Sequence, residues 1–169
     1  MPVTDALLYV HGTGSVVNGP ITGKGTATMG DDIFTATNTT DVSNIELDLG
    51  ALFPSLTERA YSNPAAPLGD GGVEFGLHLV IGAPVIGTSG GMTAGTVNIL
   101  SDATTAATTV IASRLLTIAQ LGVAGAHFFI PVDRAALKQF LRCNFVATTA
   151  AADSGTGVAW FGPRCGGEA

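Results

Sequence analysis

Apolar residues occupy every second position in a segment near the C-terminal end of the chain. From Leu141 to Ala147 every second residue is apolar, and the residues between them include the polar Arg142 and Asn144. A period of two is typical of a β-strand with one buried face and one polar face. A strand is therefore predicted here, followed by a loop of small residues and a second strand at 157–161.

The same period recurs in several earlier segments. The longest is 73–81, where Val73, Phe75 and every second residue after them form an apolar stripe typical of a central strand. His78 falls on the opposite face of this strand. The other predicted strands are 44–49, 96–101 and 126–132, and the segment 115–121 fits either a strand or a short helix.

About eight short strands with long loops predict an all-β fold, a jelly-roll-like antiparallel β-sandwich. One short helical turn is expected at 134–138, because Asp133 stands where a helix N-cap belongs. No linker divides the 169 residues, so residues 1–169 are expected to form a single β-sandwich domain. Residues 1–10 are expected to form a short strand or an extended N-terminal arm, and residues 162–169 a flexible C-terminal tail.

Two long connections lie in the N-terminal half of the chain. Residues 11–32 are rich in glycine, and residues 51–72 contain Pro54, Pro64 and Pro67. Long surface connections in compact domains are often binding surfaces. Tyr61, in the second connection, is therefore a candidate contact residue.

The chain is poor in charge for its size. Charged residues make up 12% of it, about half of the ~25% usual in a globular domain, and its mean hydropathy is +0.43. No apolar stretch reaches the roughly 20 residues that a membrane-spanning helix needs, so we expect no membrane contact. A β-protein with so few charges is expected to cover part of its surface with partner proteins.

The net charge and the N-terminal residues argue against two further classes of protein, those that bind nucleic acids and those that are secreted. The net charge of −6 argues against nucleic acid as a partner, because phosphate contacts need a basic surface. The N-terminus has no basic region before its apolar residues, so no secretory signal is expected and synthesis in a cytoplasm is favoured. Two cysteines are too few for a disulfide framework, and Cys143 fits a buried thiol.

Residues that could carry chemistry form no recognisable cluster. The string from Gly87 to Gly91 fits G-x-S-x-G, but a nucleophile elbow needs a helix after the serine, and a strand is expected there. The three histidines, His11, His78 and His127, do not stand at metal-ligand spacing. We therefore expect no enzyme activity, no catalytic residue, no cofactor and no metal.

Several residues are instead candidates for contacts with other proteins. Trp160 and Phe161 are adjacent, so a strand turns them to opposite faces, and each fits either the core or an interface. His78 would be a buried polar group if a second layer or subunit covered its face. The basic residues around the helical turn form either a solvated patch or a contact with an acidic neighbour; they are Arg134, Lys138 and Arg142.

The motif Leu141-Arg142-x-Asn144-Phe145, followed by the strand Gly157-Val158-x-Trp160, ends a series of strands at 7–10, 43–50, 75–81, 95–102 and 129–131. This order, which spans Leu7 to Phe161, resembles the small cement, or decoration, proteins of tailed bacteriophages, of the kind found on a Bordetella phage capsid. The segments 11–32 and 51–72 are longer than this resemblance leads one to expect.

The resemblance implies a jelly-roll subunit that forms a homotrimer on the outer surface of a phage capsid. Its partners would be itself and the major capsid protein, at junctions between capsid subunits, where it would stabilise the shell of the virion. It implies no catalytic residues. An alternative function is a carbohydrate- or receptor-binding β-sandwich module of a phage particle, for which Tyr61 is the candidate loop aromatic.

Overall fold

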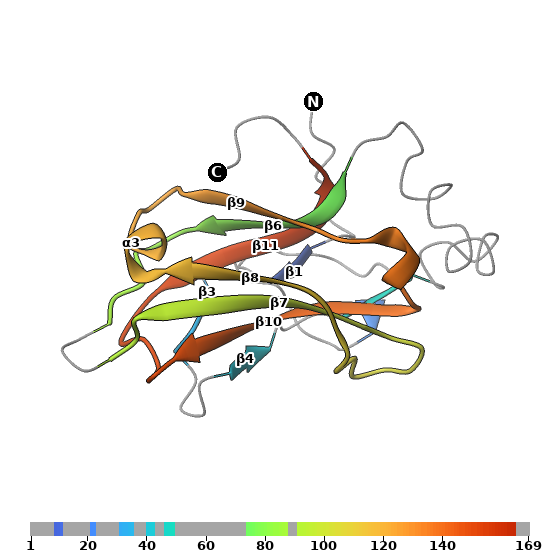
Figure 1. Cartoon of the computed structure of the whole chain (residues 1–169), viewed down its shortest axis with the longest axis horizontal. Coiled ribbons are helices and arrows are strands. Elements are labelled where there is room, and N and C mark those ends of the chain that lie inside the picture. Colours follow the sequence, from blue (N-terminus) through green and yellow to red (C-terminus); the bar gives the residue numbers. More distant parts are fainter. Residues whose placement is uncertain are drawn as a thin grey trace.

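The computed structural model describes residues 9–11, 21–22, 31–35, 40–42, 46–49, 74–87 and 91–164. Within these residues, two antiparallel β-sheets pack face to face (Figure 1). Each sheet turns one face toward the other and one face outward, which is the arrangement that alternating apolar and polar residues require.

One sheet, here called the β6 sheet, has the strand order β1-β11-β6-β9, and β3 also pairs with β11. Its strands are β1 (Tyr9–His11), β3 (Asp31–Asp32), β6 (Phe75–Ile81), β9 (His127–Pro131) and β11 (Thr156–Pro163). The other, the β10 sheet, has the order β2-β5-β10-β7-β8, and β4 also pairs with β10. Its strands are β2 (Ile21–Thr22), β4 (Thr40–Val42), β5 (Glu46–Asp48), β7 (Ala94–Asp102), β8 (Val110–Thr117) and β10 (Phe140–Thr148).

The path of the chain is that of a jelly roll. From β5 to β11 the chain crosses between the sheets at every connection except the hairpin from β7 to β8. The order β1-β11-β6-β9 therefore faces the order β5-β10-β7-β8, four strands against four, with the last strands between the first ones. The expected all-β, jelly-roll-like antiparallel sandwich is confirmed.

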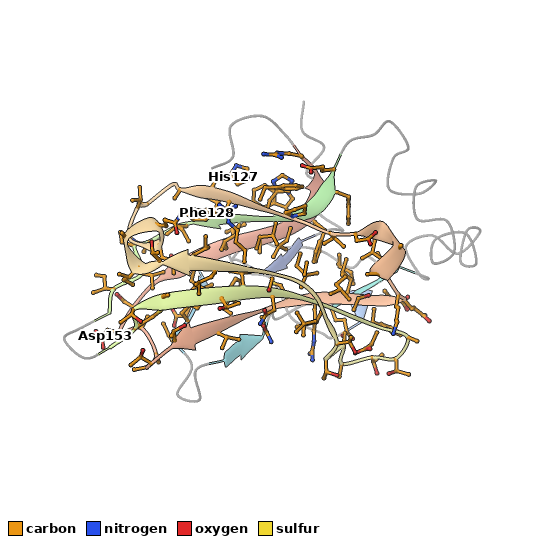
Figure 2. All side chains as sticks on the ribbon, in the orientation of Figure 1. His127, Phe128 and Asp153 are labelled. Carbon is orange, nitrogen blue, oxygen red and sulfur yellow. The ribbon has the colours of Figure 1, made fainter. Side chains whose placement is uncertain are left out.

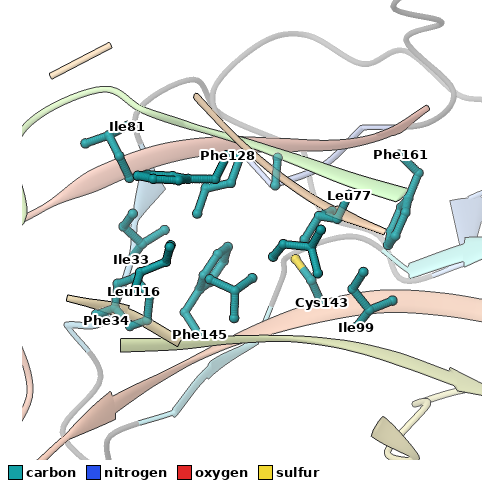
Figure 3. Packing of buried hydrophobic residues seen from close by; sticks show 14 of the residues in the cluster. Ile33, Phe34, Leu77, Ile81, Ile99, Leu116, Phe128, Cys143, Phe145 and Phe161 are labelled. Atoms are coloured by element: carbon teal, nitrogen blue, oxygen red, sulfur yellow. The ribbon is translucent and has the colours of Figure 1, made fainter. Parts of the chain in front are cut away.

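The core lies between the sheets and is filled by the apolar stripes that the sequence predicts (Figure 3). From the β6 sheet come Leu77, Leu79 and Ile81, and from the β10 sheet come Cys143 and Phe145, all with at most 1% of their surface exposed. The ring of Phe145 meets that of Phe34 edge to face, with centroids 5.5 Å apart. Such interdigitation of two inner faces is what holds a β-sandwich together.

The helical segments differ in part from the prediction. The expected turn after Asp133 is present as η3 (Arg134–Ala136), and the Asp133 carboxylate accepts the Ala135 N–H at 2.9 Å. A second segment, α3 (Ile118–Leu121), follows β8 directly. Its capping box, formed by Thr117 and Gln120, resolves the ambiguity at 115–121, because it ends the strand at Thr117 and starts a helical turn.

The structure describes a part of each predicted end of the domain. Strand β11 continues to Pro163, and the Arg164 N–H donates to the Glu74 carbonyl at 2.7 Å, so the first residues of the expected tail at 162–169 belong to the sheet. Tyr9–His11 of the expected N-terminal arm form β1, paired with β11. Residues 1–8, 50–73 and 165–169 lie outside the described residues, and Tyr61 is among them.

A substitution in the core tests this packing directly. Phe145 is fully buried, so Phe145→Ala leaves a cavity and should lower the free energy of unfolding by about 3–5 kcal/mol in urea titrations. The matched control is Leu115→Ala on β8, where the leucine is 62% exposed and a change below about 0.5 kcal/mol is expected. Equal losses in the two variants would contradict this packing.

Candidate functional site

The outward side of the β6 sheet carries rings where an exposed sheet usually carries charges. Cross-strand register sets Trp160, His78 and Phe129 in one row, and Val158, Val80 and His127 in the next. The row on the other side consists of Gly162, Gly76 and Pro131. These nine residues, here called the outer face, contain no carboxylate, lysine or arginine.

His78 lies at the centre of the outer face. Its imidazole is fully buried, although it points away from the core, and neighbouring rings pack against it. The Trp160 ring stacks on it with centroids 5.1 Å apart and an interplanar angle of 5°, and the Phe129 ring tilts against it at 4.9 Å. Aromatic rings on three adjacent strands thus form a single packed layer over the sheet.

A second histidine gives His78 a hydrogen-bond partner. The distance from His78 Nδ1 to His127 Nε2 is 3.0 Å, which makes one nitrogen the donor and the other the acceptor. The Trp160 ring contacts both imidazoles, with its centroid 5.6 Å from that of His127. Figure 2 shows His127 at the outward side of β9, where its side chain is half-buried. The pair satisfies polar atoms that burial would otherwise penalise.

One of the two glycines of the outer face lets a ring lie close to the backbone. A Cβ atom at Gly76 would overlap the Ile130 carbonyl and come within 2.8 Å of the Phe129 ring. A Cβ atom at Gly162, the cross-strand partner of Gly76, would lie 3.7 Å from the His78 ring, which is ordinary contact. Gly76 is therefore required by the packing of Phe129, whereas Gly162 is not.

One ion pair borders the outer face. Arg164 Nη1 lies 2.6 Å from Glu74 Oε2, and both side chains are about half exposed, at 54% and 52%. The Arg164 guanidinium also lies over the Phe129 ring, 5.6 Å from its centroid, in a cation–π contact. The rim thus presents one positive and one negative group beside an uncharged centre.

The structure separates the two adjacent aromatic candidates. Trp160 is half-buried on the outer face beside His78, and the two therefore belong to one site. Phe161 is fully buried in the core and stacks with Phe75, so its candidacy as an interface residue is wrong. Its parity in β11 turns it toward the other sheet, where no second molecule can reach it.

Arg142 lies in a different place, on the β10 sheet. Its Nε donates to the Ala107 carbonyl at 2.6 Å and lies 3.8 Å from Glu46 Oε2. The Glu46 carboxylate in turn accepts the N–H groups of Ala106 and Ala107 at 2.9 and 2.7 Å. Arg142 therefore fixes the loop after β7 within its own chain. The loop covers the Glu46 side chain and leaves it 7% exposed.

The same loop is fixed at its other end by Asp102. The Thr108 N–H donates to its carboxylate at 2.6 Å, and the Thr109 hydroxyl and N–H donate at 2.7 and 2.9 Å. These hydrogen bonds stabilise the charged form of the Asp102 carboxyl and hold its pKa far below its ordinary value. The bond from the Thr108 N–H has the largest effect, and the positive charge of Lys138 adds a smaller one. Lys138 is exposed; Arg134 is placed in η3, and its side chain lies outside the described part.

Other candidate chemistry finds no site in the residues that the structure describes. No group of three or more His, Cys, Asp and Glu side chains there could hold a metal ion. The string from Gly87 to Gly91 lies only partly within them, and it leads into strand β7. None of the helices in the described ranges is long and apolar enough to cross a membrane.

Sequence reasoning missed the partnership of His78 with His127, which lie 49 positions apart. The signal was the parity of the two strands, since both residues fall on the outward positions of predicted strands. No family model matches the chain, and no curated protein matches it significantly. Any inference about function therefore depends chiefly on the geometry of the outer face.

The two glycines of the outer face provide a paired test. Gly76→Ala should lower the free energy of unfolding by about 1–3 kcal/mol, because Phe129 and the Ile130 carbonyl must move. Gly162→Ala should leave stability unchanged or raise it slightly, since alanine suits a strand interior better than glycine. Urea unfolding of both variants measures this, and a Gly76→Ala protein as stable as wild type would refute the packing.

Asp102 predicts a pH dependence. Because its pKa is lowered in the folded protein, the Asp102 carboxylate stabilises the fold at pH values above the ordinary aspartate pKa of about 3.9. This stabilisation is lost as the pH falls below that pKa and the carboxylate becomes protonated. Asp102→Asn should therefore be less stable than wild type at pH 7, and the difference should narrow between about pH 4 and pH 2. Asp153→Asn, at an exposed position, is the control and should match wild type throughout. A pH-independent difference for Asp102→Asn would count against this role.

Proposed function

We propose that this chain is a structural virion protein, a capsid cement or decoration protein that trimerises and binds the outer surface of a phage capsid. The observation that carries the proposal is the outer face, an uncharged aromatic layer on a chain of net charge −6. The likeness of its strand order to the phage cement proteins adds to this observation and supplies the capsid as the partner.

Charge favours the outer face as the place where copies of this chain meet. Chains with a net charge of −6 repel one another, and contact is least costly where neither surface carries a carboxylate. Trp160, Val158 and Val80 are half-buried there, and burial of such side chains in an interface is favourable. The rim pair Glu74–Arg164 gives each copy one group of either sign to offer a neighbour.

The outward side of the β10 sheet is less suited to self-association. Its centre carries the amide pair Asn98–Asn144, hydrogen bonded at 2.9 Å. Its end is covered by the loop that Glu46 and Asp102 fix. A polar surface with its hydrogen bonds already made gains little from burial.

Cementing needs no chemistry from the protein. A molecule that binds only where several capsid subunits meet stabilises the assembled shell by mass action. Rotational symmetry repeats each weak contact, so that three modest contacts act together as one strong attachment. A surface with few charges, as in this chain, leaves wide neutral areas for such contacts.

The oligomeric state tests the proposal. Sedimentation equilibrium at micromolar concentration should give three times the chain mass of 17.0 kDa. Val158→Glu, on the outer face, should yield monomers, because the new carboxylates would be brought together in the interface. Leu115→Glu, which places the same charge on the outward side of β8 in the β10 sheet, should remain trimeric. A monomeric wild-type protein would overturn the proposal.

Binding to shells tests the capsid partner separately. The protein should co-sediment with expanded capsids of its parent phage and raise their thermal disruption temperature. A signal on a glycan array without capsid binding would favour the carbohydrate- or receptor-binding alternative instead.

A further inference from the structure

We propose that the β7–β8 loop, residues 103–109, is a preformed contact element that binds an uncharged surface of the major capsid protein. The inference rests on the proposed function, since it names the part of the chain that would meet the shell. It concerns a different surface from the outer face, which is proposed to join copies of the chain to one another.

The loop is longer than the connection requires. Strands β7 and β8 are antiparallel neighbours, and loops of about two to five residues usually join such strands. Residues 103–109 exceed that length, and they contain neither glycine nor proline, the residues that usually shape a tight turn. The conformation of the loop therefore depends on its contacts with the rest of the chain.

Two carboxylates hold four consecutive backbone N–H groups of the loop. Glu46 accepts those of residues 106 and 107, and Asp102 accepts those of residues 108 and 109. Hydrogen bonds from backbone N–H groups to a carboxylate are charge-assisted and therefore strong. The second half of the loop is thus fixed through its backbone.

Ala107 anchors the loop on the β10 sheet. Its N–H donates to Glu46 at 2.7 Å, and its carbonyl accepts from Arg142 at 2.6 Å. Its methyl group is fully buried, in a small cluster with Leu100 and Phe140. Because both polar groups and the side chain of this residue are engaged, the loop cannot slide along the sheet.

Ala106 is held in a strained conformation. Its φ is 62°, in the left-handed region that a residue with a Cβ atom rarely adopts and that glycine reaches without penalty. The Glu46 carboxylate, which accepts the Ala106 N–H at 2.9 Å, helps to fix it there. Strained residues that their surroundings hold in place cluster at binding sites and switches, and this outlier therefore points to recognition.

The exposed part of the loop sets the kind of partner. Residues 103–106 are two alanines and two threonines, all exposed, and they present methyl and hydroxyl groups without charge. Val110, at the start of β8, adds an apolar side chain that is 51% exposed. Such groups fit an uncharged protein surface, because a charged partner would lose water without gaining an opposite charge. A loop that is already ordered also loses little conformational entropy on binding.

The loop remains accessible when the outer face is covered. It packs on the outward side of the β10 sheet, at the end of the sandwich away from α3 (Figure 1). The outer face belongs to the β6 sheet, on the other side of the core. A trimer joined through the outer face would therefore offer three copies of the loop to the shell, and three small contacts act together as a stronger one.

Capsid binding tests the loop against a matched control. Thr105→Glu places a charge on the exposed part of the loop and should weaken binding to expanded capsids of the parent phage about tenfold or more, measured as Kd by co-sedimentation. Thr148→Glu makes the same change at an exposed position of β10, at the end that pairs with Ala94, and should bind as wild type does. Both variants should sediment as the wild-type protein does, because neither position lies on the outer face.

A second variant tests the preformed conformation. Glu46→Gln leaves residues 103–106 unchanged but weakens the bonds from Ala106 and Ala107. These two N–H groups should exchange their hydrogens faster than in wild type, and capsid binding should weaken as well. Faster exchange with wild-type capsid binding would overturn the claim that the loop acts because it is preformed.

The outcomes for Thr105→Glu separate this inference from the proposed function. Binding that Thr105→Glu weakens and Thr148→Glu retains supports the loop as the contact. Equal binding by wild type and Thr105→Glu would overturn the loop while leaving the cement function intact, as expected of a loop that serves only the fold. A wild-type protein that does not bind capsids would overturn both.

Discussion

Strand β6 has to be covered on both sides, and much of the structure is a response to this constraint. Its odd-numbered side chains, such as Leu77 and Leu79, are apolar and pack into the core between the sheets. Its other face carries His78, which is buried as completely as they are. A strand buried on both faces needs a neighbour on each side and a layer above it. Strands β11 and β9 supply the neighbours, and Trp160, His127 and Phe129 supply the layer.

The outward faces of the two sheets are covered in different ways. The β6 sheet covers its centre with rings and keeps charge at the rim, where Glu74 and Arg164 pair. The β10 sheet instead folds a loop onto itself and fastens it with the carboxylates of Glu46 and Asp102, which accept backbone N–H groups. Charge-assisted bonds of this kind are strong and directional, so this face is closed by its own chain. The β6 sheet therefore carries an aromatic layer on its outward side, whereas the exposed apolar residues of the β10 sheet, Val110 and Leu115, lie on β8.

The fold could be predicted from the sequence wherever alternation was regular. The periods at 73–81, 96–101 and from Leu141 to Ala147 gave the strands and their inward faces, because the side-chain period of a strand leaves only two choices of face. The capping box of α3 was also present in the sequence, at Thr117 and Gln120, but a four-residue helix is too short to produce a helical period.

The contacts of the site could be predicted only in part. Adjacent positions separated Trp160 from Phe161 onto opposite faces, but parity alone did not say which of them enters the core. The His78–His127 contact depends on the register between β6 and β9, which no local pattern specifies. The burial of Glu46 depends on a loop about 60 residues away in the sequence. Such long-range pairings are fixed by the packing of the whole sandwich.

The jelly-roll topology has a consequence for how the chain folds during its synthesis on the ribosome. Strands β10 and β11 are the last described strands to be synthesised, yet each lies inside its sheet and joins strands made much earlier. Strand β10 lies between β5 and β7, and β11 lies between β1 and β6. Neither pair of strands is therefore joined until the strand between them has been synthesised. A nascent chain therefore cannot close both sheets before β11 has been synthesised, and folding of this kind is slow because its decisive contacts are distant in sequence. A chain that lacks β10 or β11 loses an interior strand of a sheet and is not expected to fold.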